Sequence, residues 1–386
     1  MKTEKPEIVF IFQGLMGGVS SFNYNIINFS KLKSNFYSKV VLLKEESDNR
    51  ALFTEKFEVD EQLVFNFSYK ENQYHLQKRL NQYLGKAKGA IVTDFGLVVE
   101  AATRFNNPKT IYNLIHDYFY VDQQLKLKDW VDVSIAHASF YADAVYASNP
   151  EVYAGRSFFI PYGVQQLKSF PQKDNGALNL VFLGRLEKEK GAMNLFEIQQ
   201  NLNKLEIEVN WTIIGKGSAK NLLINQWKGS NVSFYEPATT QEVYALLAKQ
   251  DLFIFPTRFE GTPVAILECL ANGVVTITND LPGGIRDIIN DGIGYRCKYN
   301  NIDEYVTRIQ QLHNSRSLLF EMQKKCYALA HSNYDINQNA DKYFELFLQF
   351  EEFFRKNKSP LSKLFKLDLP YIPASVTKTI RAIRKS

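Results

Sequence analysis

The sequence predicts an α/β protein built from two doubly wound parallel sheets, one in each of two domains that face a central cleft. Its 386 residues are more than one typical domain needs. Short apolar runs alternate with helical segments, and a polar stretch at residues 165–179 divides this alternation into two series. Continuous apolar runs are typical of parallel strands that helices cover on both faces. Two such series joined by a linker favour two domains.

The first series begins with a strand because residues 8–12 form an unbroken apolar run. Helices are expected around residues 21–31 and, after the third strand, up to about residue 86. The expected strands are residues 8–14, 39–45, 63–69, 89–94, 109–117 and 131–138, and the run 157–164 ends the series.

The second series repeats the pattern after the linker. Its expected strands are residues 178–184, 209–215, 231–236, 251–257, 274–279 and 294–299, with helices around 191–205, 218–227, 240–249, 262–271, 284–289 and 302–313. A long helix is expected near the end of the chain, before a basic tail. The predicted layout is an N-terminal domain over 1–170, a C-terminal domain over 171–336, a closing helix over 337–357 that crosses back to the N-terminal domain, and a tail over 358–386.

The composition excludes several classes of protein. Hydrophobic residues make up 45% of the chain and charged residues 23%, which argues against disorder and coiled coil. A net charge of +5 is low for a nucleic-acid coat, so we expect no nucleic-acid partner. Cys269, Cys297 and Cys326 are too few and too dispersed for a disulfide framework or a zinc site, which favours a reducing, cytoplasmic compartment. We expect a soluble or peripheral protein, because no run approaches the ~20 apolar residues of a spanning helix.

The positive charge is concentrated in the tail. Residues 358–386 carry a net charge of +6, which leaves −1 for residues 1–357. The tail holds one acid, Asp368, and these basic residues: Lys358, Lys363, Lys366, Lys378, Arg381, Arg384 and Lys385. Apolar side chains lie between the charges, as in segments that rest on anionic membrane surfaces. A solvated, frayed terminus is the alternative.

The segment 253–273 is the strongest candidate for a binding site. An apolar strand ends at Pro256, and a helix follows for which Thr262 fits the N-cap and Pro263 the first position. The amides of such a helix end favour an anion. Glu260 precedes the helix and Glu268 lies inside it, where a carboxylate could accept hydrogens from two ribose hydroxyls. Exposed helix charges are the alternative interpretation of each residue alone.

Two cations follow the strand 178–184. Arg185 and Lys190 flank a turn before the next helix, which suits a pyrophosphate. Glu187, Lys188 and Glu189 lie beside them, so a solvent-facing charge cluster is the alternative.

Two further features belong to the first series. Gly17 and Gly18 precede a helix and let a backbone approach a ligand closely, although the pattern lacks the dinucleotide fingerprint. His116 ends the strand 109–117, at the sheet edge where ligands bind. His137 ends the next strand, and its role stays open.

Together these segments resemble the retaining glycosyltransferases of family 4 (glycosyl transferases group 1), which have the GT-B fold of two Rossmann-like domains. Glu260 through Glu268 matches the family's Glu-x7-Glu motif, and GRLEKEKG (184–191) its Gly-Arg-Leu…Lys-Gly segment. IIGKGS (213–218) is similar to the family's Gly-x-Gly turn. The resemblance is nearly continuous over 178–300 and looser over 8–164.

The resemblance implies a role for each matching residue. Arg185 and Lys190, beside Gly184 and Gly215, would neutralise the diphosphate of the donor. Glu268 would hold the ribose, and Glu260 with the backbone of Gly261, Thr262, Pro263 and Val264 would hold the donor sugar. His116 would contact the sugar near its reacting carbon. Gly17 and Gly18 would let the N-terminal loop approach the phosphates or the acceptor.

The implied reaction moves a hexose, with retention, from a UDP- or GDP-sugar to a glycan or glycolipid acceptor bound by the N-terminal domain. It would serve bacterial cell-surface polysaccharide or lipopolysaccharide synthesis on the inner face of the cytoplasmic membrane. The resemblance implies no metal and no cofactor, because cations and a helix end carry the charge. A catalytically silent GT-B subunit and a GT-B sugar-nucleotide epimerase are the alternatives. A Rossmann oxidoreductase is disfavoured by the missing dinucleotide fingerprint.

Overall fold

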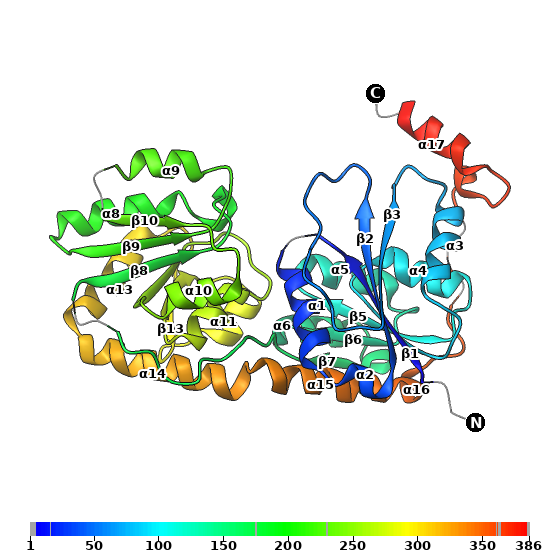
Figure 1. The fold of residues 1–386 in the computed structure, drawn as a ribbon, viewed down its shortest axis with the longest axis horizontal. Coiled ribbons are helices and arrows are strands. Elements are labelled where there is room, and N and C mark those ends of the chain that lie inside the picture. The colour runs from blue at the N-terminus through cyan, green and yellow to red at the C-terminus, as the bar shows by residue number, and fades with distance from the viewer. Residues whose placement is uncertain are drawn as a thin grey trace. The chain divides into compact units, whose positions relative to one another are not determined.

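The computed structural model describes residues 5–15, 17–173, 176–228, 231–359, 361 and 364–383. The chain divides into two compact units (Figure 1). Unit 1 consists of Met1–Pro161 together with Asn337–Ser386, and unit 2 is Tyr162–Ile336. Each unit is built around one parallel sheet, as the sequence predicts.

The sheet of unit 1 has the strand order β3-β2-β1-β4-β5-β6-β7, and every neighbouring pair is parallel. Its strands are β1 (Glu7–Gln13), β2 (Tyr37–Glu45), β3 (Glu61–Phe67), β4 (Gly89–Thr93), β5 (Lys109–Ile115), β6 (Val133–Ala136) and β7 (Ser157–Phe159). The helices before the linker are α1 (Gly18–Phe29), α2 (Leu32–Asn35), α3 (Gln73–Tyr83), α4 (Gly96–Arg104), α5 (Tyr118–Leu127), α6 (Ser139–Ser148) and α7 (Pro150–Tyr153).

Strand β1 shows why the central strands of this unit are mostly apolar. Val9 and Ile11 join a core cluster with side chains of α3 and α4. Phe10 lies on the other face, where its ring meets Phe347 at a centroid distance of 5.7 Å. Because both faces are covered, the positions between Glu7 and Gln13 at the two ends of the strand are all apolar.

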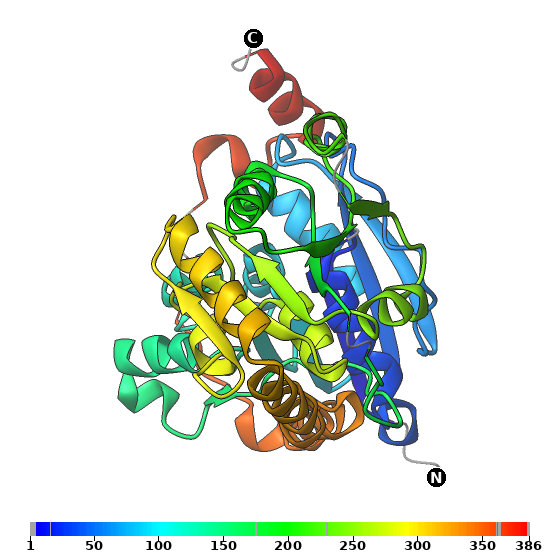
Figure 2. The same cartoon turned by 90° about the vertical axis from the view of Figure 1, so that its left-hand side faces the viewer.

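The sheet of unit 2 has the order β10-β9-β8-β11-β12-β13, again parallel. Figure 2 shows its green and yellow strands from a second direction. Its strands are β8 (Leu178–Leu183), β9 (Val209–Ile214), β10 (Val232–Tyr235), β11 (Leu252–Phe255), β12 (Val275–Asn279) and β13 (Gly294–Cys297). Its helical segments are η1 (Lys188–Lys190), α8 (Asn194–Lys204), α9 (Lys220–Gln226), α10 (Thr240–Leu247), α11 (Val264–Ala271), α12 (Gly284–Ile288), α13 (Ile302–Asn314) and α14 (Arg316–Asn333).

The end of the chain differs from the sequence expectation in two ways. Helix α14 fills a region for which no helix was expected, and its buried face includes polar Gln323 as well as Leu319 and Met322. The single closing helix expected over 337–357 is two helices, α15 (Ile336–Leu348) and α16 (Phe350–Phe353), with a break at Gln349. Both contribute to the core of unit 1, since Phe347 packs on Tyr112 and Phe353 is buried.

The described part of the tail folds against unit 1 rather than fraying (Figure 1). It forms a short turn, η2 (Lys366–Asp368), and helix α17 (Ala374–Ile383). Asp368 is fully buried and accepts hydrogen bonds from the backbone N–H of Gln73, at the first turn of α3, and from Arg381 of α17, each at 2.7 Å. A carboxylate is favourable at this end of a helix.

Most described cations of the tail have acidic partners. Lys358 lies 2.7 Å from buried Asp132, and Lys378 lies 2.8 Å from Glu46. Lys363, Arg384 and Lys385 lie outside the described residues. No helix in the described part of the chain is long and apolar enough to cross a membrane.

Removing the tail's one acid should release the tail. In Asp368→Ala, Arg381 and the N–H of Gln73 lose their carboxylate, at a cost of about 1–3 kcal/mol to local docking. We expect limited proteolysis to cut the segment 364–383 faster than in the parent protein. Lys366→Ala, at an exposed position of the same turn, is the matched control. Equal cleavage of both variants would contradict the docked arrangement.

Candidate functional site

The loops that follow β8 and β11 lie against each other at the carboxyl edge of the unit 2 sheet. Gly191 ends η1 with φ +72°, and a Cβ there would lie 2.0 Å from the carbonyl oxygen of Pro256. The backbone N–H of Arg258 donates to the carbonyl of Glu189 at 2.8 Å. Glycine is therefore required at position 191, and the close approach fixes one loop on the other.

This contact brings two predicted site residues together. Lys190 Nζ lies 2.5 Å from Glu260 Oε1, and the two side chains are only 19% and 9% exposed. The Thr257 hydroxyl donates to the same oxygen at 3.1 Å. Burial raises the pKa of Glu260, and the neighbouring Lys190 opposes that rise. The pair is a partly desolvated ion pair whose members depend on each other.

Arg185 lies in the same loop as an exposed side chain. The loop is held from the other side by Glu187, which accepts hydrogen bonds from the N–H and the hydroxyl of Ser218 at 2.9 and 2.6 Å. These bonds lower the pKa of Glu187. A Cβ on Gly215 would lie 1.9 Å from the carbonyl oxygen of Gly184, so the two predicted glycines are in contact.

Helix α11 begins one residue later than the sequence suggests. Pro263, not Thr262, is the N-cap, with φ −76° and ψ 101°, and Val264 is the first helical residue. A proline without an N–H is tolerated here because that group would lie outside the helix. The residues before the helix rest on a second turn, where the N–H of Gly284 donates to the carbonyl of Gly261 at 3.0 Å.

Glu268 lies in the middle of α11 and is half-buried. Burial raises its pKa to about 7. A carboxyl group in this condition gains from hydroxyl donors, which stabilise its ionised form.

In unit 1 three strand ends place polar side chains together. His116 follows β5 and Asp94 follows the neighbouring strand β4. His116 Nε2 lies 3.4 Å from Asp94 Oδ2, and the side chains are 5% and 3% exposed. His137 follows β6, and its ring centroid lies 4.8 Å from that of His116.

His137 is held by the C-terminal part of the chain. Its Nδ1 lies 2.8 Å from the hydroxyl of Tyr343 on α15 and 3.2 Å from the carbonyl of Ile160. Burial lowers the pKa of His137 well below its usual value, so the ring is neutral. Phe22 of α1 packs on both histidines, with centroid distances of 5.3 Å to His116 and 4.3 Å to His137.

Sequence reasoning missed three members of this group, Asp94, Tyr343 and Phe22. Asp94 was within reach, because it follows a predicted strand in the same way as His116. Tyr343 and Phe22 carry no such signal, because only the fold brings α15 and α1 to this edge.

Gly17 and Gly18 stand at the start of α1, as N-cap and first residue. A Cβ at either position would meet no atom within 4 Å among the described residues. Packing therefore does not demand glycine here, but the backbone of Gly17, at φ +156°, favours glycine by its conformation alone.

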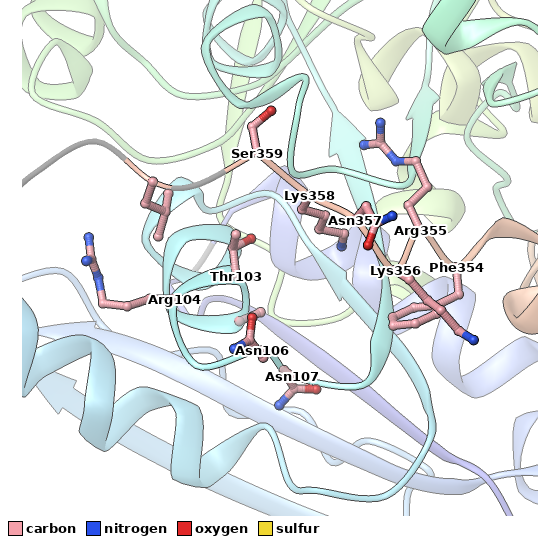
Figure 3. Close-up of a pocket in the computed structure, with 12 residues that line it drawn as sticks. Thr103, Arg104, Asn106, Asn107, Phe354, Arg355, Lys356, Asn357, Lys358 and Ser359 are labelled. Carbon is pink, nitrogen blue, oxygen red and sulfur yellow. The ribbon is translucent and has the colours of Figure 1, made fainter.

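A separate cavity of about 480 Å³ lies where the segment 354–361 passes the end of α4 (Figure 3). Asn106 and Asn107 line it just before β5 begins, so it belongs to the opposite, amino edge of the sheet. Within the described residues, no three His, Cys, Asp or Glu side chains gather as metal ligands would.

Residues 164–330 match the model of the family described as glycosyl transferases group 1. The match spans nearly all of unit 2. The matched segment holds Arg185, Lys190, Glu260 and Glu268, whereas His116, Gly17 and Gly18 lie outside it.

The curated relatives that resemble this chain differ in how much of it they share. The putative teichuronic acid biosynthesis glycosyltransferase TuaC of Bacillus subtilis is 28% identical over 42% of this chain. The chain spans about two fifths of the length of relatives such as this one. The UDP-Gal:α-D-GlcNAc-diphosphoundecaprenol α-1,3-galactosyltransferase of Escherichia coli is 21% identical over 66% of this chain and 72% of its own length.

Solved structures match the fold over most of the chain. HepE of Anabaena in complex with UDP matches with a TM-score of 0.69 at 14% identity, over 89% of this chain and all of that one. The fold is therefore GT-B, as the sequence resemblance implies.

The two predicted diphosphate ligands should respond differently to truncation. Lys190→Ala leaves the Glu260 carboxylate buried without its cation, which should cost about 3 kcal/mol in the free energy of unfolding. Arg185→Ala removes an exposed side chain and should change this energy by no more than about 0.5 kcal/mol. Urea titration of each variant measures its free energy of unfolding. The double variant Lys190→Ala/Glu260→Gln should recover much of the loss; if it does not, the ion pair is not its source.

Proposed function

We propose that this protein is a retaining glycosyltransferase that moves a hexose from a nucleoside-diphosphate sugar to a glycan or glycolipid acceptor in bacterial cell-surface polysaccharide synthesis. The observation that best supports this proposal is the arrangement of Arg185, Lys190 and Glu260 on two loops held together at the carboxyl edge of the unit 2 sheet. Glu268 follows in the next helix. The match of residues 164–330 to the glycosyl transferases group 1 family supports the same function.

In this proposal, unit 2 holds the donor. Arg185 and Lys190 bind the diphosphate, with Gly184 and Gly215 admitting it close to the backbone. Glu268 accepts hydrogen bonds from the ribose, and Glu260 with residues 261–264 holds the sugar. UDP is favoured as the nucleotide, since HepE was solved with UDP and the Escherichia coli relative uses UDP-Gal by its name.

The donor's charge changes the balance of the Lys190–Glu260 pair. A diphosphate brings negative charge to a lysine that already has one carboxylate 2.5 Å away. Lys190 then interacts with two anions, the Glu260 carboxylate and the diphosphate. Arg185 supplies a second positive charge to compensate them. Both cations stabilise the diphosphate as it leaves, which is electrostatic catalysis by groups already in place.

The reaction on the sugar follows from retention. The acceptor oxygen bonds to the anomeric carbon on the face from which the diphosphate departs, the bond from that carbon to the phosphate oxygen breaks, and the departing phosphate takes the acceptor's proton. His116 contacts the sugar near the reacting carbon. Gly17 and Gly18 leave space for the phosphates or for the acceptor.

Unit 1 holds the acceptor in this proposal. Tyr118 and Phe119 lie two and three residues after His116 and are exposed aromatic side chains at the start of α5. Such rings stack on the apolar faces of sugars. The Escherichia coli relative acts, by its name, on a sugar linked to diphosphoundecaprenol, which favours a glycolipid acceptor here.

The alternatives are disfavoured by particular residues. A catalytically silent subunit has no need of Arg185, Lys190 and Glu260, which this chain retains. An epimerase of GT-B fold should lack the Arg185 and Lys190 arrangement.

A glycolipid acceptor favours a place on the inner face of the cytoplasmic membrane, with the tail as the contact. Phe365 and Tyr371 are 82% and 75% exposed, and Ile383 ends α17 with 68% exposure. Lys366 is exposed between them. Because Lys358, Lys378 and Arg381 have acidic partners, exposed apolar side chains contribute more to this contact than the net charge alone implies.

Donor binding should depend on pH through Glu268. A thermal-shift screen of UDP-, GDP- and ADP-sugars identifies the donor as the compound that raises the unfolding temperature. Because the ribose needs the ionised carboxylate and the pKa of Glu268 is about 7, affinity for the intact nucleotide sugar should fall about tenfold from pH 8 to pH 6. Calorimetry at the two pH values measures this.

Glu268→Gln is the matched control for that experiment. It should bind the nucleotide sugar weakly and with no pH dependence between these values. A variant that keeps the tenfold change would exclude Glu268 as the ribose ligand. Failure of every nucleotide sugar to raise the unfolding temperature would count against the transferase itself.

Membrane contact is best tested by point substitution, since deletion of the tail would also remove the buried Asp368 and Lys358 contacts. Phe365→Ser/Tyr371→Ser should reduce sedimentation of the protein with phosphatidylglycerol vesicles while leaving the tail docked. Lys358→Ala removes a cation from the same segment that faces Asp132 instead of solvent, and should sediment as the parent does. Equal pelleting of the double variant would rule out this contact.

A further inference from the structure

The cavity at the amino edge of the unit 1 sheet has no part in the reaction proposed above. It measures about 480 Å³ and lies between the end of α4 and the segment that begins at Phe354 (Figure 3). Asn107 lines it two residues before β5 begins, whereas His116 follows the carboxyl end of the same strand. The length of β5 therefore separates the cavity from His116 by roughly 20 Å.

Two buried oxygen atoms of the cavity lining have no hydrogen-bond partner among the described residues. They are Oγ1 of Thr103, in the last turn of α4, and Oδ1 of Asn107. The nitrogen of the Asn107 carboxamide is occupied, because it donates to the carbonyl of Gly85 at 2.9 Å and to Asn81 Oδ1 at 3.2 Å. The Asn107 oxygen can only accept, so a ligand with hydroxyl groups supplies the hydrogens that this pair of oxygens lacks.

Cations make up a third of the cavity lining. Four lining residues carry a positive charge: Arg104, Arg355, Lys356 and Lys358. Arg355 and Lys358 share one buried carboxylate, that of Asp132, at 3.4 and 2.7 Å. These two are therefore held by the protein itself, and a ligand would meet the other two.

Arg104 and Lys356 lie on opposite sides of the cavity (Figure 3). Arg104 Nε donates to Gln77 Oε1 at 2.6 Å, and Gln77 in turn donates to Glu100 at 2.8 Å, which fixes the side chain of Arg104. Lys356 is exposed and takes part in none of the ion pairs among the described residues. The four cations thus face only two carboxylates, those of Asp132 and Glu100, and this surplus favours an anion.

The backbone at this edge does not reverse that preference. Helix α4 ends here, and free carbonyl groups at the end of a helix attract cations. The carbonyl of Ala102 already accepts from the N–H of Asn107 at 2.9 Å, in the turn that closes the helix. The loop before β4, which Asn107 contacts at Gly85, adds exposed Lys86 and Lys88.

We infer that this cavity binds a phosphate ester of a polyol, with Arg104 and Lys356 on the phosphate and with Thr103 Oγ1 and Asn107 Oδ1 on its hydroxyl groups. The hydroxyl groups satisfy the two buried oxygens, and the phosphate offsets the surplus of positive charge. A soluble polyol phosphate and the headgroup of phosphatidylglycerol present this same chemistry. The inference does not depend on the transfer reaction.

Calorimetry with glycerol phosphate measures binding directly. Lys356→Glu reverses an exposed charge and should weaken binding at least about tenfold. Lys249→Glu makes the same change at an exposed position of unit 2 and should bind as the parent does. Thr103→Val removes the unpartnered hydroxyl and should weaken binding about threefold or more without lowering the unfolding temperature.

The donor cations in unit 2 are a second place where a phosphate can bind. Arg185→Ala should leave the affinity for glycerol phosphate unchanged, because Arg185 does not line this cavity. Loss of binding in Arg185→Ala together with normal binding in Lys356→Glu would assign the phosphate to the donor loops and overturn the inference.

Vesicles identify the source of the ligand. If it is the lipid headgroup, Lys356→Glu should sediment less than Lys249→Glu with phosphatidylglycerol vesicles, and glycerol phosphate should compete. If it is soluble, the two variants should sediment alike while calorimetry still separates them. Phosphatidylcholine vesicles, whose headgroup has no net charge and no hydroxyl group, are the control. Variants that behave alike in both calorimetry and sedimentation would overturn the inference.

Discussion

All the candidate residues depend on one geometric constraint, which is that parallel strands end at the same edge of a sheet. Asp94, His116 and His137 each follow a different strand of unit 1, and their side chains meet there. In unit 2 the same rule brings the loop of Lys190 to the loop of Glu260. The amino edge serves another purpose: Glu7, at the start of β1, binds Lys109 at the start of β5, and this pair ties strands together without facing a site.

The sequence predicts the two sheets well because nearly every strand is covered on both faces. The run around Val9 and Phe10 is apolar for that reason, and its pattern is visible without a structure. Helix α14 was missed because polar Gln323 stands on its buried face. The sequence did not indicate the break at Gln349. It also did not indicate the docking of the tail, because the partner of Asp368, the N–H of Gln73 at the start of α3, is known only from the fold.

The candidate site was predictable residue by residue but not in its pairings. Lys190 and Glu260 could each be identified by their places after strands. Their ion pair depends on the left-handed turn at Gly191, and the spacing of residues in the sequence does not predict that turn. Without a ligand, each charge is compensated by the other, which keeps both side chains ordered in a partly dry environment. The two charges of the candidate site are therefore already in place in the absence of a ligand, and a substitution of either residue leaves the other without its partner.

The division of unit 1 into two stretches of chain has a consequence for synthesis on the ribosome. Phe347, Tyr343 and Asp368 complete the core and one helix end of a unit whose sheet was made some two hundred residues earlier. Unit 2 is continuous and has all its strands before α15 begins. The later unit in the chain can thus finish folding first, while the face of the earlier sheet around Phe10 stays uncovered until α15, which carries Phe347, has been synthesised.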